Sequence, residues 1–114
     1  MPQFLKYTPP GIKVLSGATT GNSNVIALND CIAAQFLIVG SAGIAAGAVN
    51  LESSHDANYA GTWNQLIAPI TAVASAAVGG SFQGTPIGGF VRARVTTNVT
   101  GGTVDVYING TAVE

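Results

Sequence analysis

The chain's one histidine lies in a short polar segment that holds the residue types needed for catalysis or metal binding. Glu52, Ser53, Ser54, His55 and Asp56 are consecutive. A Ser–His–Asp triad is defined by geometry, and neighbouring residues of one loop rarely converge on one point. The two carboxylates could bind calcium, but their spacing does not match the acidic pattern of a calcium loop. We therefore expect a polar turn bonded to nearby backbone amides, with no catalytic residue, metal or cofactor.

Two further residues occur once each and could carry chemistry. Trp63 follows the polar segment and could stack on a sugar if it were exposed. A tryptophan at the start of a strand is more often a core anchor with its N–H hydrogen-bonded, and we expect that role here. Cys31 is the single cysteine, which excludes an intrachain disulfide and a cysteine zinc site. Because it lies in an apolar run, we expect a small buried hydrophobic residue.

Charged residues make up 8% of the chain, against about 25% in ordinary soluble domains. Four Lys and Arg residues in a chain of net charge −1 cannot neutralise many phosphates, so we expect no nucleic-acid partner. The same charge argues against binding to an anionic membrane surface. Copies with so little charge repel one another weakly, so we expect a homo-oligomer or a larger assembly. A neutral monomer coated with Thr and Asn is the alternative.

Residues 31–49 are apolar enough to resemble a membrane span, with Gln35 and Ser41 as polar interruptions. However, residues 40–43 have the sequence of a turn, and no Lys or Arg flanks either end. We expect two buried strands joined by this turn, and no membrane partner.

Residues 1–11 are predicted to form an extended N-terminal arm that precedes a β-sandwich domain of residues 12–114. Pro9 and Pro10 fix an extended path and lack backbone donors. A solvated tail would leave the apolar side chains of the arm exposed to water, so we expect them to contact a neighbouring subunit instead. These residues are Phe4, Leu5 and Tyr7.

After Gly11 the chain consists of short β-type runs separated by turn residues. The runs are 12–15, 25–28, 35–39, 44–53, 63–67, 90–95 and 104–108, with 16–24 and 54–62 as loops. Residues 70–78 are rich in alanine but alternate and precede Gly79 and Gly80, so we predict a strand or extended loop. No segment predicts a helix convincingly. The fold expected is all-β, a single-domain jelly-roll-like β-sandwich.

Two alternating runs near the C-terminus are the clearest strands of the chain. In 90–95 the apolar residues Val91, Ala93 and Val95 alternate with Arg92 and Arg94, and 104–108 alternates in the same way. Residues 100–102 supply a turn, so we predict a β-hairpin in which Asp105 pairs with one of the two arginines. Such exposed pairs contribute about 0–1 kcal/mol. Four residues remain as interaction candidates: His55, Asp56, Arg92 and Arg94.

Two segments, VNLESSHDANYAGTWNQL and FVRARVTTNVTGGTVDVYIN, resemble small virion proteins of tailed bacteriophages. The family is that of capsid decoration (cement) proteins and related accessory proteins. The resemblance implies a homotrimer that binds the major capsid protein on the capsid surface and bridges neighbouring subunits. It implies a structural role in the virion, with no enzymatic activity.

Two alternatives remain open. The same Ser–Asp–Trp arrangement resembles discoidin-like sugar-binding jelly rolls, although this chain lacks their paired cysteines. That resemblance implies a carbohydrate- or receptor-binding module that uses the loop of residues 53–63. A tail or baseplate structural subunit would share the same fold.

Overall fold

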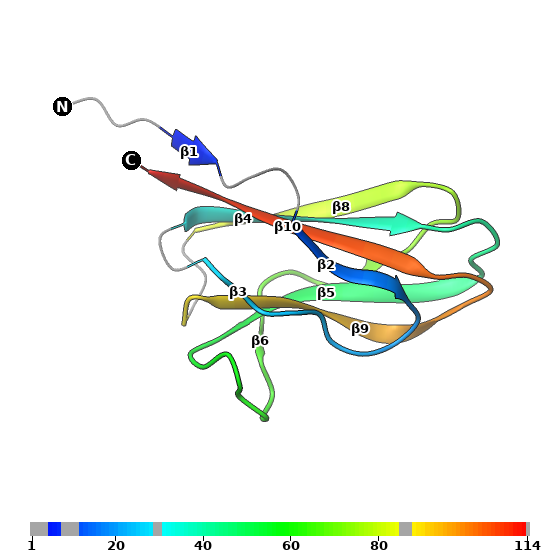
Figure 1. Ribbon diagram of the computed structural model, residues 1–114, viewed down its shortest axis with the longest axis horizontal. Helices are drawn as coiled ribbons and strands as arrows, with labels where there is room; N and C mark the ends of the chain where they lie inside the picture. The colour runs from blue at the N-terminus through cyan, green and yellow to red at the C-terminus, as the bar shows by residue number, and fades with distance from the viewer. Residues whose placement is uncertain (1–4, 8–11, 29–30, 85–87, 114) are drawn as a thin grey trace.

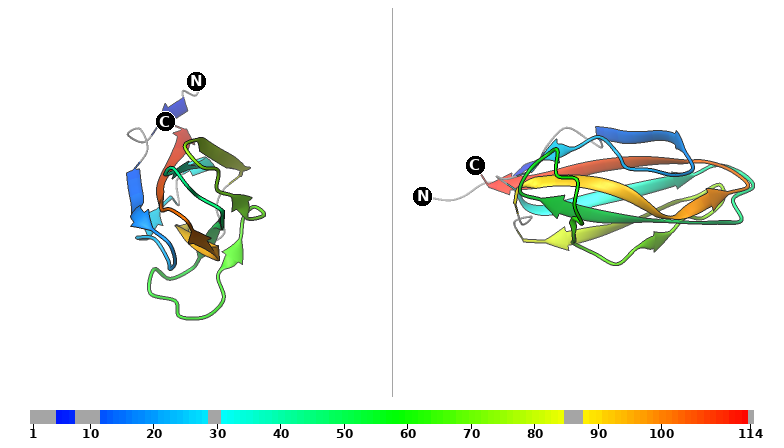
Figure 2. Two further views of the ribbon diagram at one scale, coloured as in Figure 1. Left: turned by 90° about the vertical axis from the view of Figure 1, so that its right-hand side faces the viewer. Right: turned by 90° about the horizontal axis from the view of Figure 1, so that it is seen from below.

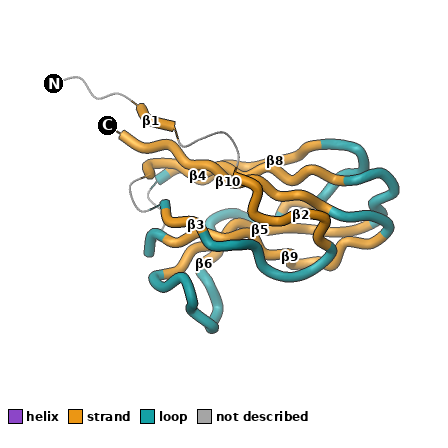
Figure 3. Tube along the Cα trace, in the orientation of Figure 1, coloured by secondary structure: helices purple, strands orange, loops and turns teal. Residues whose placement is uncertain are grey.

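Ten β-strands and no helix are present in the described part of the chain, which is residues 5–7, 12–28, 31–84 and 88–113 of a computed structural model (Figures 1 and 3). The strands are β1 Leu5–Tyr7, β2 Ile12–Ala18, β3 Ile26–Ala27, β4 Cys31–Gly40, β5 Ala46–Ser54, β6 Asn64–Gln65, β7 Ile70–Thr71, β8 Ala77–Gln83, β9 Phe90–Thr100 and β10 Val104–Val113. No helix of the described residues is long and apolar enough to cross a membrane.

The strands form two five-stranded sheets that pack face to face (Figure 2). Sheet A has the order β1-β10-β4-β8, with β2 also paired to β10. Sheet B has the order β3-β9-β5-β6, with β7 also paired to β5. The long strands pair antiparallel. The chain changes sheet between β2 and β3, β3 and β4, β4 and β5, β7 and β8, β8 and β9, and β9 and β10. The all-β sandwich predicted from the sequence is confirmed.

The core lies between the two sheets and is built by the alternating residues of the long strands. On β9, Val91, Ala93 and Val95 are buried, as the sequence predicts. On β4, Phe36 and Ile38 are buried in the same cluster. Branched and aromatic side chains at every second position fill the gap between two sheets without polar atoms. Cys31 is buried at the start of β4, which confirms the role predicted for it.

The predicted C-terminal hairpin is wrong. β9 pairs with β3 and β5 in sheet B, whereas β10 pairs with β4, β2 and β1 in sheet A. The turn after Thr100 therefore carries the chain from one sheet to the other. Alternation shows which face of each strand is buried, but strands facing each other across a core alternate in the same way as paired strands. The pattern could not distinguish these two arrangements.

Two turns that cross between the sheets touch each other through glycines. Gly43 lies between β4 and β5 at φ 88°, and Gly101 lies between β9 and β10 at φ 81°. A Cβ added at Gly43 would lie 2.8 Å from the carbonyl oxygen of Gly101, and one added at Gly101 would meet the carbonyl oxygen of Gly43. The Ala45 N–H donates to the Thr100 carbonyl at 2.8 Å, which joins the turns. The predicted turn within 31–49 is confirmed.

Substituting Gly101 by alanine is expected to lower the free energy of unfolding by about 3 kcal/mol, because the new methyl group meets backbone that cannot move aside. Gly17→Ala is the matched control. Gly17 also has a positive φ, of 57°, but nothing lies within 4 Å of an added Cβ. The control should cost about 1 kcal/mol, from backbone strain alone. Urea unfolding followed by Trp63 fluorescence measures both, and equal losses would contradict the close contact of the turns.

Several boundaries differ from those predicted. The run 63–67 forms only the two-residue strand β6, and 70–78 divides into β7 and the start of β8. Gly79 and Gly80 continue β8 and do not end it, because a strand tolerates glycine where a neighbouring chain approaches closely. A Cβ added at Gly80 would lie 2.7 Å from the Ile70 side chain.

Part of the predicted arm joins sheet A. Residues Leu5–Tyr7 form β1, and their backbone pairs with residues 111–113 of β10. Phe4 lies outside the described residues, as do the side chains of Leu5 and Tyr7. Contact between the arm and a neighbouring subunit therefore stays a prediction.

Candidate functional site

A buried carboxylate lies on the outer face of sheet B, the face directed away from sheet A. Leu51 of β5 points into the core, so its neighbours Asn50 and Glu52 point outward. Both are nevertheless buried. Segment 55–66 returns along this edge of the sheet and places Gln65 of β6 opposite Glu52. The loop thus covers polar residues that an ordinary sheet surface would leave in water.

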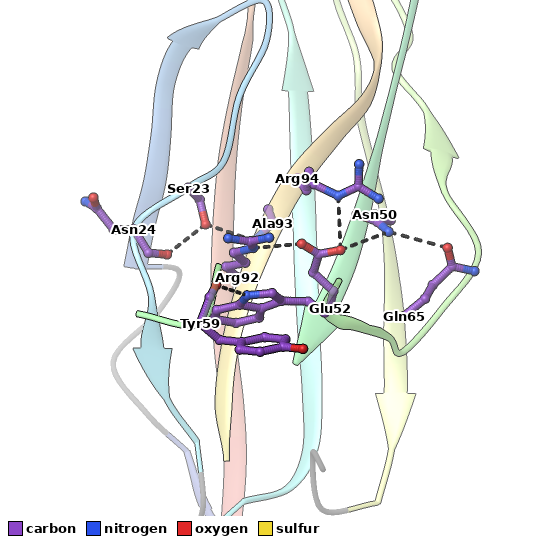
Figure 4. Close-up of polar contacts among 10 residues, drawn as sticks. Ser23, Asn24, Asn50, Glu52, Tyr59, Gln65, Arg92, Ala93 and Arg94 are labelled. Atoms are coloured by element: carbon purple, nitrogen blue, oxygen red, sulfur yellow. Dashed lines mark hydrogen bonds and ion pairs between the residues drawn. The ribbon is translucent and has the colours of Figure 1, made fainter. Parts of the chain in front are cut away.

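Glu52 is held by two arginines from the neighbouring strand β9 (Figure 4). Its Oε1 accepts a hydrogen bond from Arg92 Nε at 2.7 Å, and its Oε2 accepts one from Arg94 Nε at 3.1 Å. The side chains are 2% exposed for Glu52, 14% for Arg92 and 43% for Arg94. One carboxylate therefore compensates two guanidinium groups, and the cluster carries one net positive charge.

Trp63 packs under the loop and against this cluster. The Arg92 guanidinium carbon lies 4.1 Å from the centroid of the Trp63 ring, a cation–π contact. The indole N–H donates to the Tyr59 carbonyl at 2.9 Å. The burial and the hydrogen-bonded N–H predicted for Trp63 are confirmed, but the ring anchors the loop to sheet B and does not belong to the core cluster between the sheets. Because the ring is buried, it offers no open platform for a sugar.

Asn50 extends the polar layer beneath the loop. Its Nδ2 lies 3.5 Å from Glu52 Oε2 and 3.4 Å from Gln65 Oε1, and donates to both. Its Oδ1 is buried and accepts no hydrogen bond from a described residue. Beneath the loop, the outer face of sheet B therefore carries a largely buried polar layer, whereas the β5 and β9 side chains that point between the sheets are mainly apolar.

Two adjoining cavities open around the loop. The first, which we call the arginine pocket, holds about 320 Å³ and is lined by Glu52, Ala60, Gly61, Thr62, Trp63, Arg92 and Arg94. The second, the tyrosine pocket, holds about 230 Å³ and is lined by Ser53, Ser54, His55, Tyr59, Thr62 and Asn64. Thr62 lines both, so the two pockets meet at this residue.

The polar segment around His55 forms the turn predicted from the sequence. Asp56 Oδ1 accepts a hydrogen bond from the Asn58 N–H at 3.0 Å, and the Asp56 N–H donates to Ser54 Oγ at 3.3 Å. His55 makes a ring contact with Tyr59, with centroids 5.0 Å apart. Within the described residues, no three His, Cys, Asp or Glu side chains form a group that could hold a metal ion.

The predicted pairing of Asp105 with an arginine is wrong. Asp105 forms an ion pair with Lys13 of β2 at 3.5 Å and accepts the Gly17 N–H at 2.7 Å. Since β9 and β10 belong to different sheets, Arg92 and Arg94 lie opposite Glu52 and Asn50 instead. The strand predicted over residues 44–53 alternates inside and outside at 49–53, which correctly directs Glu52 away from the core. Nothing in that alternation predicts that this strand pairs with the one that carries the arginines.

No protein-family model matches the chain, and no curated protein matches it. Among solved structures, the K1 cleaved adhesin domain of Lys-gingipain from Porphyromonas gingivalis W83 is similar, with a TM-score of 0.57 and 14% identity. The match covers 82% of this chain and 60% of that one.

Two weaker similarities are to phage proteins. The SPBc2 prophage-derived protein YomS has a TM-score of 0.46 and 14% identity, covering 100% of this chain and 96% of that one. A chain of the cyanophage Pam1 capsid asymmetric unit has a TM-score of 0.45 and 17% identity, covering 96% and 82%. At such identities similarity concerns the fold, and the fold defines the class: a two-sheet β-sandwich module.

Proposed function

We propose that this protein is a structural subunit of a bacteriophage virion that binds the outside of the capsid and bridges major capsid subunits. The observation that carries the proposal is an uncharged, partly apolar surface on sheet A, which we call the β4–β8 face. It consists of Gln35, Leu37 and Val39 of β4 with Ala77, Gly79 and Ser81 of β8. The resemblance of two segments to decoration proteins supports the same assignment.

The β4–β8 face is formed by residues directed away from the core. Leu37 is 42% exposed, although Phe36 and Ile38 on either side are buried. On the β8 side it lies opposite Gly79, which has no side chain to cover it, and on the β10 side it lies opposite Tyr107. Neither β4 nor β8 contains a charged residue, and β8 lies at one edge of sheet A in the described part of the chain. Proteins usually protect an exposed edge strand with charge, proline or a bulge.

A sheet surface without charge on β4 and β8 fits another protein subunit better than it fits a charged polymer. Burying one leucine side chain contributes roughly 1.5–3 kcal/mol, a modest amount for a single copy. A subunit that binds as an oligomer, with a trimer expected here, multiplies this contribution across its copies. Weak single contacts repeated over a capsid thus stabilise the shell without strong binding by any one chain.

Leu37→Glu tests this proposal, because the substitution places a charge at the centre of the face and leaves the core intact. The wild-type protein should sediment with capsids of the phage that encodes it, and should raise the temperature at which they open. The variant should bind at least tenfold more weakly, since losing about 1.4 kcal/mol or more per contact has this effect. Circular dichroism should be unchanged.

The native mass and the position on the virion complete the test. Light scattering should give three times the chain mass, and electron microscopy should show density on the outer capsid surface. Density confined to the tail or baseplate would replace the capsid proposal with a tail subunit. A wild-type protein that stays monomeric and binds no capsid would overturn the proposal.

A further inference from the structure

We propose that the arginine pocket binds the carboxylate of an acidic saccharide, with the sugar extending into the tyrosine pocket. This site is on sheet B and is independent of the β4–β8 face. It does not rest on the proposed role in the virion.

The cluster of Glu52, Arg92 and Arg94 carries one net positive charge, which an anionic ligand would neutralise. Arg92 and Arg94 are two of the four Lys and Arg residues in the whole chain, and both lie beside Glu52. A second carboxylate would bring two positive and two negative charges together. Both arginines contact Glu52 through Nε, and the side chain of Arg94 is 43% exposed, so its Nη groups can donate to a ligand. A guanidinium fork matches the two oxygens of a carboxylate.

The arginines are fixed before any ligand arrives. Glu52 holds both Nε groups, and Trp63 lies under the Arg92 guanidinium at 4.1 Å. A ligand therefore does not have to immobilise two long flexible side chains, which lowers the entropy cost of binding. Thr62 adds a hydroxyl group to the wall of the same pocket.

The neighbouring pocket favours a sugar as the carrier of the carboxylate. Tyr59 is 39% exposed and its ring is braced by His55, which gives an aromatic surface beside the cavity. Asn64 and Thr62 line the same cavity with amide and hydroxyl groups. An aromatic surface with a few polar groups is the usual lining of a small-molecule site, and the hydroxyl groups of a sugar can bond to such polar groups. Thr62 lines both cavities, so the proposed ligand would place its carboxylate on one side of this residue and its sugar on the other.

An oligosaccharide of galacturonic acid is the probe, and its methyl-esterified form is the matched ligand without charge. Trp63 is the chain's one tryptophan and touches Arg92, so its fluorescence should report binding. We expect saturable binding of the acid that weakens as salt is raised, and at least tenfold weaker binding of the ester. Calorimetry run in parallel detects binding that leaves the fluorescence unchanged.

Arg94→Gln should weaken binding of the acid about tenfold or more. Lys13→Gln is the control, because it removes one positive charge from a side chain that is also 43% exposed and also ion-paired, but in sheet A. Its affinity for the acid should stay within twofold of wild type, and circular dichroism should show both variants folded.

Four results would overturn the inference. One is the absence of binding by both methods at millimolar acid. Another is equal binding of the acid and its ester, or equal loss in the two variants. Equal affinity for poly-glutamate would show a site for acidic peptide instead of saccharide.

Discussion

Replacing Glu52 by glutamine is expected to lower the free energy of unfolding by about 3–5 kcal/mol, the range measured when one partner of a buried ion pair is removed. Glutamine keeps the size of the side chain and one acceptor oxygen, so the loss of stability comes from removing the negative charge. Arg94 is 43% exposed and can be hydrated, but the Arg92 side chain is 14% exposed and would be left largely desolvated beside Trp63.

Asp105→Asn is the matched control for this substitution. It also changes a strand carboxylate to an amide of the same size, and it also breaks an ion pair. The side chains of Asp105 and Lys13 are 34% and 43% exposed, so the expected cost is below about 1 kcal/mol. Urea unfolding compares the two variants. Equal losses in the free energy of unfolding would show that burial does not increase the contribution of Glu52 to stability. They would also show that the loop does not shield the cluster from water.

The sequence predicts well which face of each strand is buried, but it predicts poorly which strands pair with each other. The alternation of Val91, Ala93 and Val95 with the arginines specified which side chains are buried, because the pleat fixes side-chain direction locally. Pairing is a long-range property. The sequence predicts Asp105 beside the arginines because strands close in sequence often pair, yet the turn at Gly101 carries β10 into the other sheet. Nothing local to 90–108 distinguishes the two outcomes.

The candidate site was predicted in parts. The burial of Trp63 and the polar turn at Asp56 follow from residue type and local hydrogen bonding. The cluster of Glu52 with two arginines depends on the register of β5 against β9, which joins residues 40 or more positions apart. The covering of this outer face by segment 55–66 was also not predicted, because a loop that returns over a polar sheet face has no periodic signal.

Ile38→Ala is expected to lower the free energy of unfolding by about 2–5 kcal/mol. Ile38 of β4 is fully buried between the sheets, so truncation leaves a cavity in the core as well as removing buried apolar surface. Its neighbour Leu37 loses a similar number of atoms in Leu37→Ala, but that side chain is 42% exposed. The second substitution should cost less than about 1 kcal/mol.

Comparing Ile38→Ala with Leu37→Ala tests which face of β4 points into the core. The proposed capsid contact depends on this orientation. Unfolding should be repeated at tenfold lower protein concentration, because association would make the apparent stability of both variants depend on concentration. A one-residue change of register would exchange the two side chains between core and surface. If Leu37→Ala proved the more damaging substitution, Leu37 would belong to the core and the β4–β8 face would not be the surface that binds the capsid.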